Sequence, residues 1–381
     1  MKKLFLLLLI SNYSFSQSFV PNAPDLDLKS YILIEPTTNT IIAESNSTGL
    51  IEPASMTKVM TAYVLADQID NDLISLDDKV LISEKAWKMG GSKMFIEVGK
   101  KVSIEDLLKG IIIQSGNDAA VAISEYVGGT EDGFVDLMNA YAVSLGMDNT
   151  DFRNSTGLPD EKHLTSSKDL ATLTSNFMTK FPDIFALFKE KEFEYGGISG
   201  NKFNRNKLLW RDETADGVKT GYTSSAGYCL IGSAIRGNMR LITVVAGSDT
   251  ANKSFADTQR LLEYGFRFYA TQKYFDANKE YTKAKVWGGN ADQASLGVEK
   301  DVLVTLPRTN FKNVIVNYNI KNNVQAPIKK GEKLGTLEII SNDKIVAVSD
   351  LIALEDVDSK GFFGRLWTKF VLWLMSLFGI A

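Results

Sequence analysis

Three short clusters of polar residues hold side chains that could together carry out acyl transfer. They occur in the order Ser55-Met56-Thr57-Lys58, Ser115-Gly116-Asn117 and Lys219-Thr220-Gly221. On a helix, the spacing of the first cluster puts its hydroxyl and its amine on one face, within hydrogen-bonding reach. A serine hydroxyl is a weak nucleophile that needs an adjacent base, and the chain has only one histidine, His163. The sequence therefore predicts that Ser55 is a nucleophile and that Lys58 is its base.

The other two clusters would supply the groups that acyl transfer needs around the nucleophile. Ser115 could pass a proton to the leaving amine, and Asn117 could hold a substrate amide. Lys219 and Thr220 offer a charge and a hydroxyl to a substrate carboxylate, and Gly221 lets a substrate backbone lie close to the chain. These residue types therefore suit a substrate that carries both an amide and a carboxylate.

A lysine works as a base near neutral pH only when its pKa is lowered by burial or by a neighbouring cation. For Lys58 the natural second cation is Lys219, and the positive potential at a helix N-terminus would also favour the neutral amine. The backbone N–H groups of Ser55 and Tyr222 could form an oxyanion hole, in which one donor is typically worth about 10²–10³-fold in rate.

Each cluster also has an ordinary structural explanation when it is taken alone. Serine precedes lysine by three residues in many helices, and Ser115 and Asn117 are of the types preferred at helix N-caps. The combination is more specific, because S-x-x-K, S-x-N and K-T-G in this order form the motif series of penicillin-binding proteins and serine β-lactamases.

The surrounding sequence predicts the elements that must position these clusters. Ser55 lies in the first turn of a helix that begins near Pro53, Ser115-Gly116-Asn117 lies on a turn between two helices, and Lys219 opens an edge strand. Periodicity and turn signals predict a hairpin over residues 30–43, helices from 103 and over 134–145 and 255–269, and strands over 226–235 and 240–247.

These elements predict two domains. Strands at both ends of residues 24–272, with helices between them, indicate an α/β domain whose first and last strands share one sheet. Residues 276–356 consist of short β-rich runs separated by Gly, Asn, Asp and Lys, which predicts a small all-β domain. Because it holds no cluster of catalytic residue types, we interpret that domain as a spacer or an interaction module.

Both ends of the chain carry apolar segments. Basic residues, a short apolar run and small residues predict a signal peptide over residues 1–16, and therefore export.

Residues 359–381 are apolar except for one narrow helical stripe, and the uncharged run after Lys369 has 12 residues, short of the roughly 20 that span a membrane. We therefore predict an amphipathic helix in the membrane interface, with Arg365 and Lys369 toward the headgroups. Docking into its own domain or a partner, and a tail anchor that partly inserts, are the alternatives.

Composition and charge argue against nucleic-acid binding, and the residue types argue against disulfides and bound cofactors. The chain has 381 residues, of which 44% are hydrophobic, and a net charge of −4 that becomes more acidic once the signal peptide is removed. Nucleic-acid binding would require a clustered basic face instead. The single cysteine, Cys229, permits no intramolecular disulfide and is most simply a core residue. No metal or organic cofactor is implied, because no cluster of His, Cys and Asp has ligand spacing.

Over essentially its whole length, the chain resembles the low-molecular-weight penicillin-binding proteins that are D-alanyl-D-alanine carboxypeptidases. Besides the three clusters, five segments carry the resemblance: Asn204-Arg205-Asn206-Lys207-Leu208-Leu209-Trp210, Asp216-Gly217-Val218-Lys219-Thr220-Gly221, Tyr264-Gly265-Phe266-Arg267-Phe268, Ala294-Ser295-Leu296-Gly297 and Gly361-Phe362-Phe363-Gly364. The resemblance implies a penicillin-binding-protein/β-lactamase-like transpeptidase fold, with a mostly antiparallel sheet flanked by helices. It also implies a β-domain and a C-terminal amphipathic helix that anchors the protein peripherally at the periplasmic face of the cytoplasmic membrane.

The activity that this resemblance implies is removal of the terminal D-alanine from peptidoglycan stem pentapeptides. Ser55 would form an acyl-enzyme that water hydrolyses, and β-lactams would inhibit by acylating the same serine. Some family members carry His where this chain has Tyr222, and Arg near the substrate carboxylate where this chain has Asp249. Carboxylate recognition would then rest on Lys219, Thr220, Thr223 and Arg205.

Three alternatives share part of this pattern. A serine β-lactamase has the same clusters but needs a deacylating group such as the Glu of an E-x-x-L-N segment, which Asp151-Phe152-Arg153-Asn154 does not match. A D,D-endopeptidase that cuts peptidoglycan crosslinks would use the same site. A non-catalytic peptidoglycan-binding protein would keep the fold but would have no need of the base.

Overall fold

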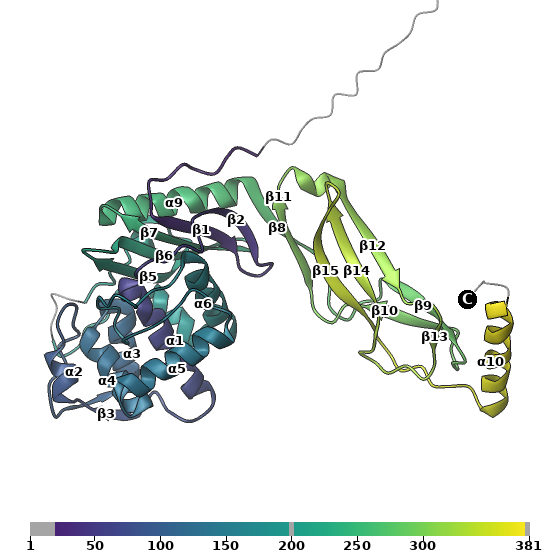
Figure 1. The fold of residues 1–381 in the computed structure, drawn as a ribbon, viewed down its shortest axis with the longest axis horizontal. Helices are drawn as coiled ribbons and strands as arrows, with labels where there is room; N and C mark the ends of the chain where they lie inside the picture. The colour runs from purple at the N-terminus through teal and green to yellow at the C-terminus, as the bar shows by residue number, and fades with distance from the viewer. Residues whose placement is uncertain (1–19, 198–201, 378–381) are drawn as a thin grey trace, which may run out of the picture. The chain divides into compact units, whose positions relative to one another are not determined.

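The computed structural model describes residues 20–197 and 202–377, and these form two compact units (Figure 1). The first unit consists of Ala23–Phe275 together with Asp301–Thr305, and the second of Asp276–Lys300 together with the chain from Leu306. The predicted signal peptide, residues 1–16, lies outside the described residues.

The first unit is built on a five-stranded antiparallel sheet with the order β2-β1-β7-β6-β5. Its strand β1 pairs with β7, so that Leu33 lies opposite Thr243. The predicted sharing of one sheet by the first and last strands of the domain is therefore confirmed. The strand bounds are Ser30–Glu35 (β1), Thr40–Ser45 (β2), Ala215–Thr223 (β5), Gly227–Arg236 (β6) and Met239–Ser248 (β7).

Helices cover both faces of this sheet (Figure 1). Leu33 and Leu241 face helix α9 (Ala251–Phe268), where a Cβ on Gly265 would lie 2.6 Å from Leu241. Ile32 and Ile242 alternate to the opposite face, where they join the main hydrophobic core. That core also contains the buried sides of the longer helices α1 (Lys58–Asp70), α4 (Asn117–Gly128), α5 (Glu131–Ser144) and α6 (Ser167–Lys180).

Short elements connect these longer ones. They are the 3₁₀ turns η1 (Ala54–Thr57) and η3 (Ala186–Lys189), the π turn η2 (Gly110–Gln114), the helices α2 (Glu84–Lys88), α3 (Ile104–Lys109), α7 (Pro182–Phe185) and α8 (Leu208–Arg211), and the paired strands β3 (Lys79–Leu81) and β4 (Lys101–Ser103).

Helix α1 lies in the centre of the domain. Every residue from Lys58 to Asp67 is buried, so the helix has no solvent-facing stripe. Ser55, which the sequence placed in the first turn of this helix, lies in the 3₁₀ turn η1 that leads directly into it. The first motif is therefore fixed by the packing of the core.

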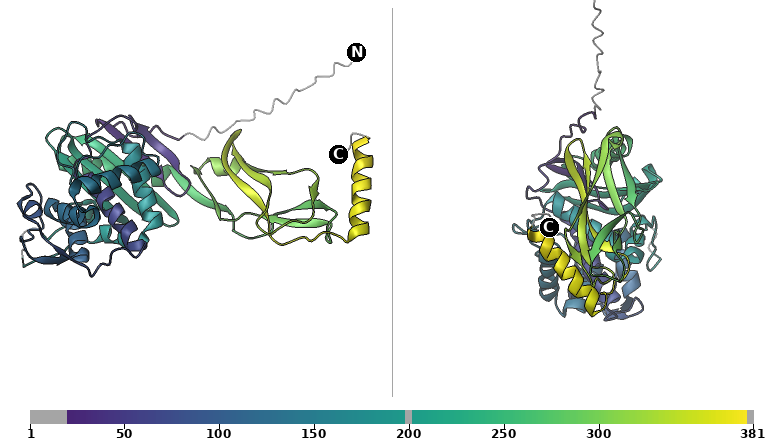
Figure 2. Two further views of the ribbon diagram at one scale, coloured as in Figure 1. Left: turned by 60° about the horizontal axis from the view of Figure 1, so that its bottom comes forward. Right: turned by 90° about the vertical axis from the view of Figure 1, so that its right-hand side faces the viewer.

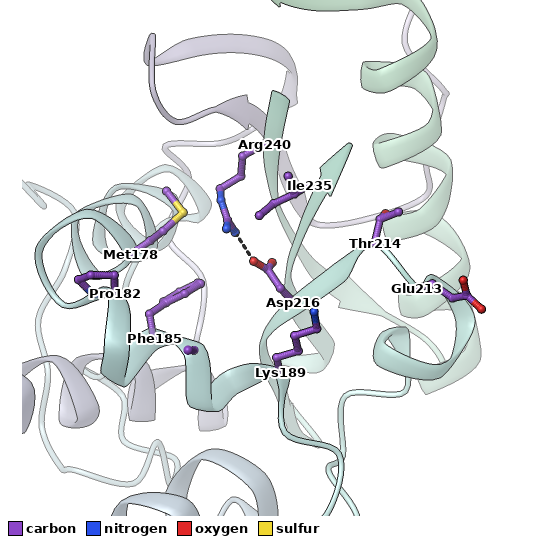
Figure 3. A pocket seen from close by; sticks show the side chains of 10 residues that line it. Met178, Pro182, Phe185, Lys189, Glu213, Thr214, Asp216, Ile235 and Arg240 are labelled. Carbon is purple, nitrogen blue, oxygen red and sulfur yellow. Dashed lines mark ion pairs between the residues drawn. The ribbon is translucent and has the colours of Figure 1, made fainter. Parts of the chain in front are cut away.

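An ion pair and a hydrogen bond of one arginine link three strands of the sheet beside a cavity of about 480 Å³ (Figure 3). Arg240 on β7 forms an ion pair of 2.6 Å with Asp216 on β5, and it donates a 2.7 Å hydrogen bond to Ser233 Oγ on β6. Nearby, Phe188 of η3 packs against Gly217, since a Cβ built on Gly217 would lie 3.2 Å from the Cβ of Phe188. These contacts fix the start of β5, the strand that carries Lys219.

The second unit contains a six-stranded sheet with the order β12-β14-β15-β10-β9-β13, followed by helix α10 (Figure 2). The predicted all-β domain is thus confirmed. Among the described residues, no helix is both long enough and apolar enough to cross a membrane. The bounds are Thr282–Trp287 (β9), Gln293–Gly297 (β10), Val314–Ile320 (β12), Val324–Gln325 (β13), Lys333–Ser341 (β14), Lys344–Ala353 (β15) and Phe362–Leu377 (α10), with a 3₁₀ turn at Asn310–Asn313 (η5).

Two boundaries differ from the sequence analysis. Asp301–Thr305 groups with the first unit, because β11 (Val302–Pro307) pairs with β8 (Tyr269–Phe275) and Thr305 Oγ1 donates to Glu35 Oε2 at 3.2 Å. Lys219 lies within β5 rather than opening it, since the strand begins at Ala215. That strand is at an edge of its sheet, as predicted.

Candidate active site

The turn that carries Ser55 is enclosed by two glycines. Gly157 has φ +83°, and a Cβ there would lie 1.8 Å from the carbonyl oxygen of Ala54. A Cβ on Gly221 would lie 3.0 Å from the carbonyl oxygen of Pro53. A side chain would clash at Gly157 and would be tightly confined at Gly221, so the loop at Gly157 and strand β5 both approach the backbone of the serine turn closely.

Lys58 makes three contacts through its amine. Its Nζ lies 3.2 Å from Ser55 Oγ, 2.7 Å from Asn117 Oδ1 and 2.6 Å from the carbonyl oxygen of Thr156. A neutral amine has two N–H donors and one lone pair. With the two donors directed to Asn117 and Thr156, the lone pair is left to accept the hydroxyl proton of Ser55, which is the geometry that a general base requires.

Burial and a neighbouring cation lower the pKa of Lys58 to about 7. The side chain is only 1% exposed, so loss of hydration is the largest cause, and the positive charge of Arg205 adds to it. Asp118 opposes the shift. Burial also lowers the pKa of Lys219, followed by repulsion from Lys58 and Arg205. Arg205, which the sequence did not connect with Lys58, is therefore a cation that lowers its pKa, and Lys58 and Lys219 repel each other.

The second cluster links the two lysines to the cleft. Ser115, in the left-handed region at φ 61°, lies between η2 and α4, on the turn that the sequence predicted. Its Oγ accepts a 2.8 Å hydrogen bond from Lys219 Nζ. Asn117, which contacts Lys58, also donates to the carbonyl oxygen of Gly90 at 2.7 Å. The three clusters therefore meet in one place.

A cleft of about 410 Å³ opens in front of these groups. It is lined by Ser55, Ser115, Thr220, Gly221, Tyr222 and Arg205, among others. Tyr222 is 55% exposed and stacks on Tyr228, with ring centroids 4.3 Å apart. Arg205 donates from Nε to the carbonyl oxygen of Gln114 at 3.0 Å.

Thr223 and Asp249 are not among the side chains that line this cleft. The Thr223 hydroxyl accepts a 2.9 Å hydrogen bond from the Ala226 N–H, and it lies 3.4 Å from Glu52 Oε2. Asp249 is exposed, between β7 and α9. Cys229 is buried, as predicted, and burial raises the pKa of its thiol to about 11.

His163 is buried away from the nucleophile. Its Nδ1 accepts the Arg153 N–H at 3.0 Å, so Nε2 carries the proton that it donates to Thr57 Oγ1 at 2.8 Å. Burial lowers the pKa of His163 to about 4, which keeps the ring neutral. The histidine therefore supports the turn next to Ser55 and supplies no base.

Sequence reasoning missed two supports of the site. The carbonyl oxygen of Thr156 binds Lys58, but a backbone contact leaves no signal in residue type. Asp118 is fully buried and accepts the N–H groups of Met94 at 2.9 Å and Phe95 at 2.8 Å. It thereby fixes the loop whose Gly90 carbonyl holds Asn117. Asp118 directly follows the Ser115-Gly116-Asn117 cluster in the sequence, but its residue type alone does not indicate these contacts.

The described residues contain no group of three or more His, Cys, Asp and Glu side chains that could hold a metal ion. What the cleft does contain is two serine side chains, Ser55 and Ser115, each of which contacts a buried lysine. The fold and the cleft together define a serine hydrolase in which a lysine, rather than a histidine, lies beside the serine.

Comparison with known proteins agrees with this class. The family model described as D-alanyl-D-alanine carboxypeptidase matches residues 17–250, and that of the penicillin-binding protein 5 C-terminal domain matches residues 269–359. D-alanyl-D-alanine carboxypeptidase DacC of Escherichia coli (strain K12) is 38% identical, with 98% of this chain and 96% of the relative covered.

Solved structures show the same likeness. Penicillin binding protein 5 from Haemophilus influenzae superposes with a TM-score of 0.84 at 34% identity, covering 89% of this chain and all of that one. Penicillin-Binding Protein D2 from Listeria monocytogenes, in its ampicillin-bound form, gives a TM-score of 0.59 at 30% identity over 65% of this chain and 99% of its own. The chain belongs to the D-alanyl-D-alanine carboxypeptidase family.

The lowered pKa of Lys58 predicts how acylation of Ser55 depends on pH. The free base is the reactive form, so the second-order rate of acylation should rise with pH and level off above an apparent pKa of about 7. Replacing Arg205 with Gln removes a repelling cation, which should raise the pKa of Lys58 and move this rise to higher pH. Stopped-flow acylation by a chromogenic ester or thioester ending in a carboxylate measures the profile.

Arg267→Gln is the matched control, since Arg267 is an exposed arginine on α9. Its profile should overlay that of the wild type. A rise that stays at the same pH in Arg205→Gln, or that occurs above pH 9 in the wild type, would contradict the assigned cause.

Proposed function

We propose that this protein is a serine-type D-alanyl-D-alanine carboxypeptidase that removes the terminal D-alanine from peptidoglycan stem pentapeptides. The observation that carries the proposal is the 3.2 Å contact between Ser55 Oγ and the Nζ of Lys58, a lysine whose pKa is lowered to about 7. A serine held against an amine that is partly neutral at pH 7 is a competent nucleophile, and a protein that only binds peptidoglycan would not need it.

In the proposed acylation step, Lys58 takes the hydroxyl proton as Ser55 Oγ attacks the carbonyl carbon of the penultimate D-alanine. The carbon–nitrogen bond to the terminal D-alanine then breaks, and Ser115 gives its proton to the leaving amine. Ser115 regains a proton from Lys219 across their 2.8 Å hydrogen bond. One lysine has then gained a proton and the other has lost one, so the charge of the pair is unchanged.

Substrate binding and deacylation use the same groups. The charge of Lys219 and the hydroxyl of Thr220 would hold the terminal carboxylate, with Arg205 as a further cation on the cleft wall. Once proton exchange has returned Lys58 to the neutral form, it would accept a proton from the water that hydrolyses the acyl-enzyme. The backbone N–H groups of Ser55 and Tyr222 would serve as the oxyanion hole, and Thr223 would support the Tyr222 end of β5.

β-Lactams should acylate Ser55 in place of the peptide. A relative that shares the fold has been solved in an ampicillin-bound form. When the β-lactam ring opens, its amine stays covalently linked to the acyl group. It therefore remains in the cleft, whereas D-alanine leaves. We therefore expect a stable adduct on Ser55.

The remaining parts of the chain would determine where in the cell the enzyme acts. We propose a signal peptide over residues 1–16, a catalytic domain over 24–272, a β-domain over 276–356, and a membrane-anchoring helix within 359–381. Helix α10 supports the last assignment, because Phe363 is 84% exposed and Phe362, Trp367 and Trp373 are exposed as well. Large apolar side chains exposed along one helix are typical of helices that bind a membrane surface. The enzyme would then act at the periplasmic face of the cytoplasmic membrane.

The catalytic proposal is tested by D-alanine release from a pentapeptide that ends in D-Ala-D-Ala, using Ser55→Ala. We expect release by the wild type and a loss of about 10³-fold or more in the variant, because an enzyme that loses its nucleophile keeps only residual catalysis. Ser144→Ala, which alters an exposed serine on α5, is the control and should match the wild type. Release that persists in Ser55→Ala would overturn the assignment, and cleavage of crosslinked dimers alone would identify an endopeptidase.

The anchor is tested by deleting residues 359–381 and fractionating the cells. The truncated protein should move from the membrane to the soluble fraction and should keep its specific activity, because α10 lies outside the catalytic unit. A double variant, Phe363→Asp with Trp367→Asp, should behave in the same way, whereas Val143→Asp on the exposed face of α5 should stay on the membrane. If the truncated protein remains on the membrane, the helix is not the anchor.

A further inference from the structure

A second hollow lies next to the catalytic cleft. It has a volume of about 350 Å³ and is lined by Phe203, Asn204, Lys207, Trp210 and Arg211. Phe203 and Trp210 are exposed over 52% and 45% of their surface, which leaves two large aromatic side chains open to solvent on one part of the domain. We refer to Phe203, Lys207, Trp210 and Arg211 as the aromatic–basic shelf.

The shelf is continuous with the catalytic cleft. Lys207 lines both hollows. Arg211 donates from Nη2 to Asn252 Oδ1 at 2.8 Å, and Asn252 lines the cleft. A chain that leaves the cleft on this side would therefore pass directly onto the shelf.

Positive charge surrounds the aromatic surface. Lys191 Nζ lies 5.7 Å from the ring centre of Trp210, and Lys202 Nζ lies 5.1 Å from that of Phe203. With Lys207 and Arg211 these make four cations, of which Lys202 is paired with Glu192 at 2.9 Å. An apolar floor with a basic rim suits a ligand that combines methylene groups with carboxylates.

We propose that the shelf binds the upstream part of the acyl-donor peptide, as an extended acidic segment. Its carboxylates would lie against Lys207 and Arg211, and its aliphatic side chains against Phe203 and Trp210. An acidic peptide fits better than a neutral sugar, because cations surround the two rings and a neutral sugar has no charge to pair with them. This inference rests on the proposed carboxypeptidase function, and it makes the shelf the specificity-determining surface of that same site.

Binding at the shelf would affect catalysis as well as affinity. The shelf lies outside the reacting groups, so its contacts would help to hold the scissile bond against Ser55 during the reaction. The gain would appear only for substrates long enough to reach the shelf. Because the attraction is between charges at the surface, it would weaken as ionic strength rises.

The test compares D-alanine release by Trp210→Ala from three peptides that end in D-Ala-D-Ala. They are an N-acetylated tripeptide without carboxylate side chains, a pentapeptide with two free upstream carboxylates, and the same pentapeptide with those carboxylates amidated. We expect the wild type to prefer the acidic over the amidated pentapeptide by about 10-fold in kcat/KM. In Trp210→Ala, kcat/KM should fall by about 10-fold for the acidic pentapeptide and should not change for the tripeptide.

Two further variants separate the effect of charge at the shelf from a general effect of removing an exposed aromatic side chain. Lys207→Gln should reduce the ratio of kcat/KM for acidic over amidated pentapeptide to near one. Tyr126→Ala alters another half-exposed aromatic, at the opposite end of α4 from Asn117, and should leave all three substrates unchanged.

Three outcomes would overturn the proposal. One is an equal loss by Trp210→Ala on every peptide, which would mean a general disturbance of the cleft. Another is no loss on the acidic pentapeptide. The third is a loss that appears only when the peptide is attached to a glycan, which would assign the shelf to sugar. Failure of the carboxypeptidase function itself is distinguishable, because the wild type would then release no D-alanine even from the tripeptide.

Discussion

The site depends on the burial of two lysine side chains beside Ser55 and Ser115, the serines that line one cleft. Lys58 and Lys219 are 1% and 2% exposed. A buried ammonium loses its hydration and must find partners or give up its proton. Lys58 does both, because its amine contacts Asn117 Oδ1 and the Thr156 carbonyl while its pKa falls to about 7. The fold thus places an amine of lowered pKa beside Ser55, as the proposed base requires.

The rest of the domain provides this burial from segments far apart in the chain. Helix α1 contributes Lys58 from the centre of the core, the turn before α4 contributes Ser115, and edge strand β5 contributes Lys219. The close approach of these segments requires small residues, and Gly157 and Gly221 fill those positions without side chains. Because β5 is an edge strand, its outer side has no neighbouring strand within the sheet, and a substrate could extend along it.

Much of this arrangement could be predicted from the sequence, since motif spacing and apolar periodicity are local properties. The pairing of Ser55 with Lys58 follows from helical spacing, and the turn at Ser115 follows from the apolar runs on either side. Contacts made by the backbone could not be predicted, such as the Thr156 carbonyl on Lys58. The effect of the Arg205 charge on the pKa of Lys58 depends on long-range packing, which residue types and spacing do not reveal. The sequence predicted that β11 belongs to the β-domain, because the segments on either side of it do. Its pairing with β8, which no local pattern reveals, places most of it in the first unit.

The central claim, that burial lowers the pKa of Lys58 to about 7 and leaves the amine partly neutral at physiological pH, can be measured directly. The protein would be labelled with lysine enriched in ¹³C at Cε and ¹⁵N at Nζ, and the Lys58 resonance would be assigned by its loss in Lys58→Arg. Titration by NMR should then give a midpoint near pH 7, well below the ordinary lysine value of about 10.4. A midpoint above pH 9 would show that Lys58 remains an ammonium in the folded protein, and Ser55 would then need another base.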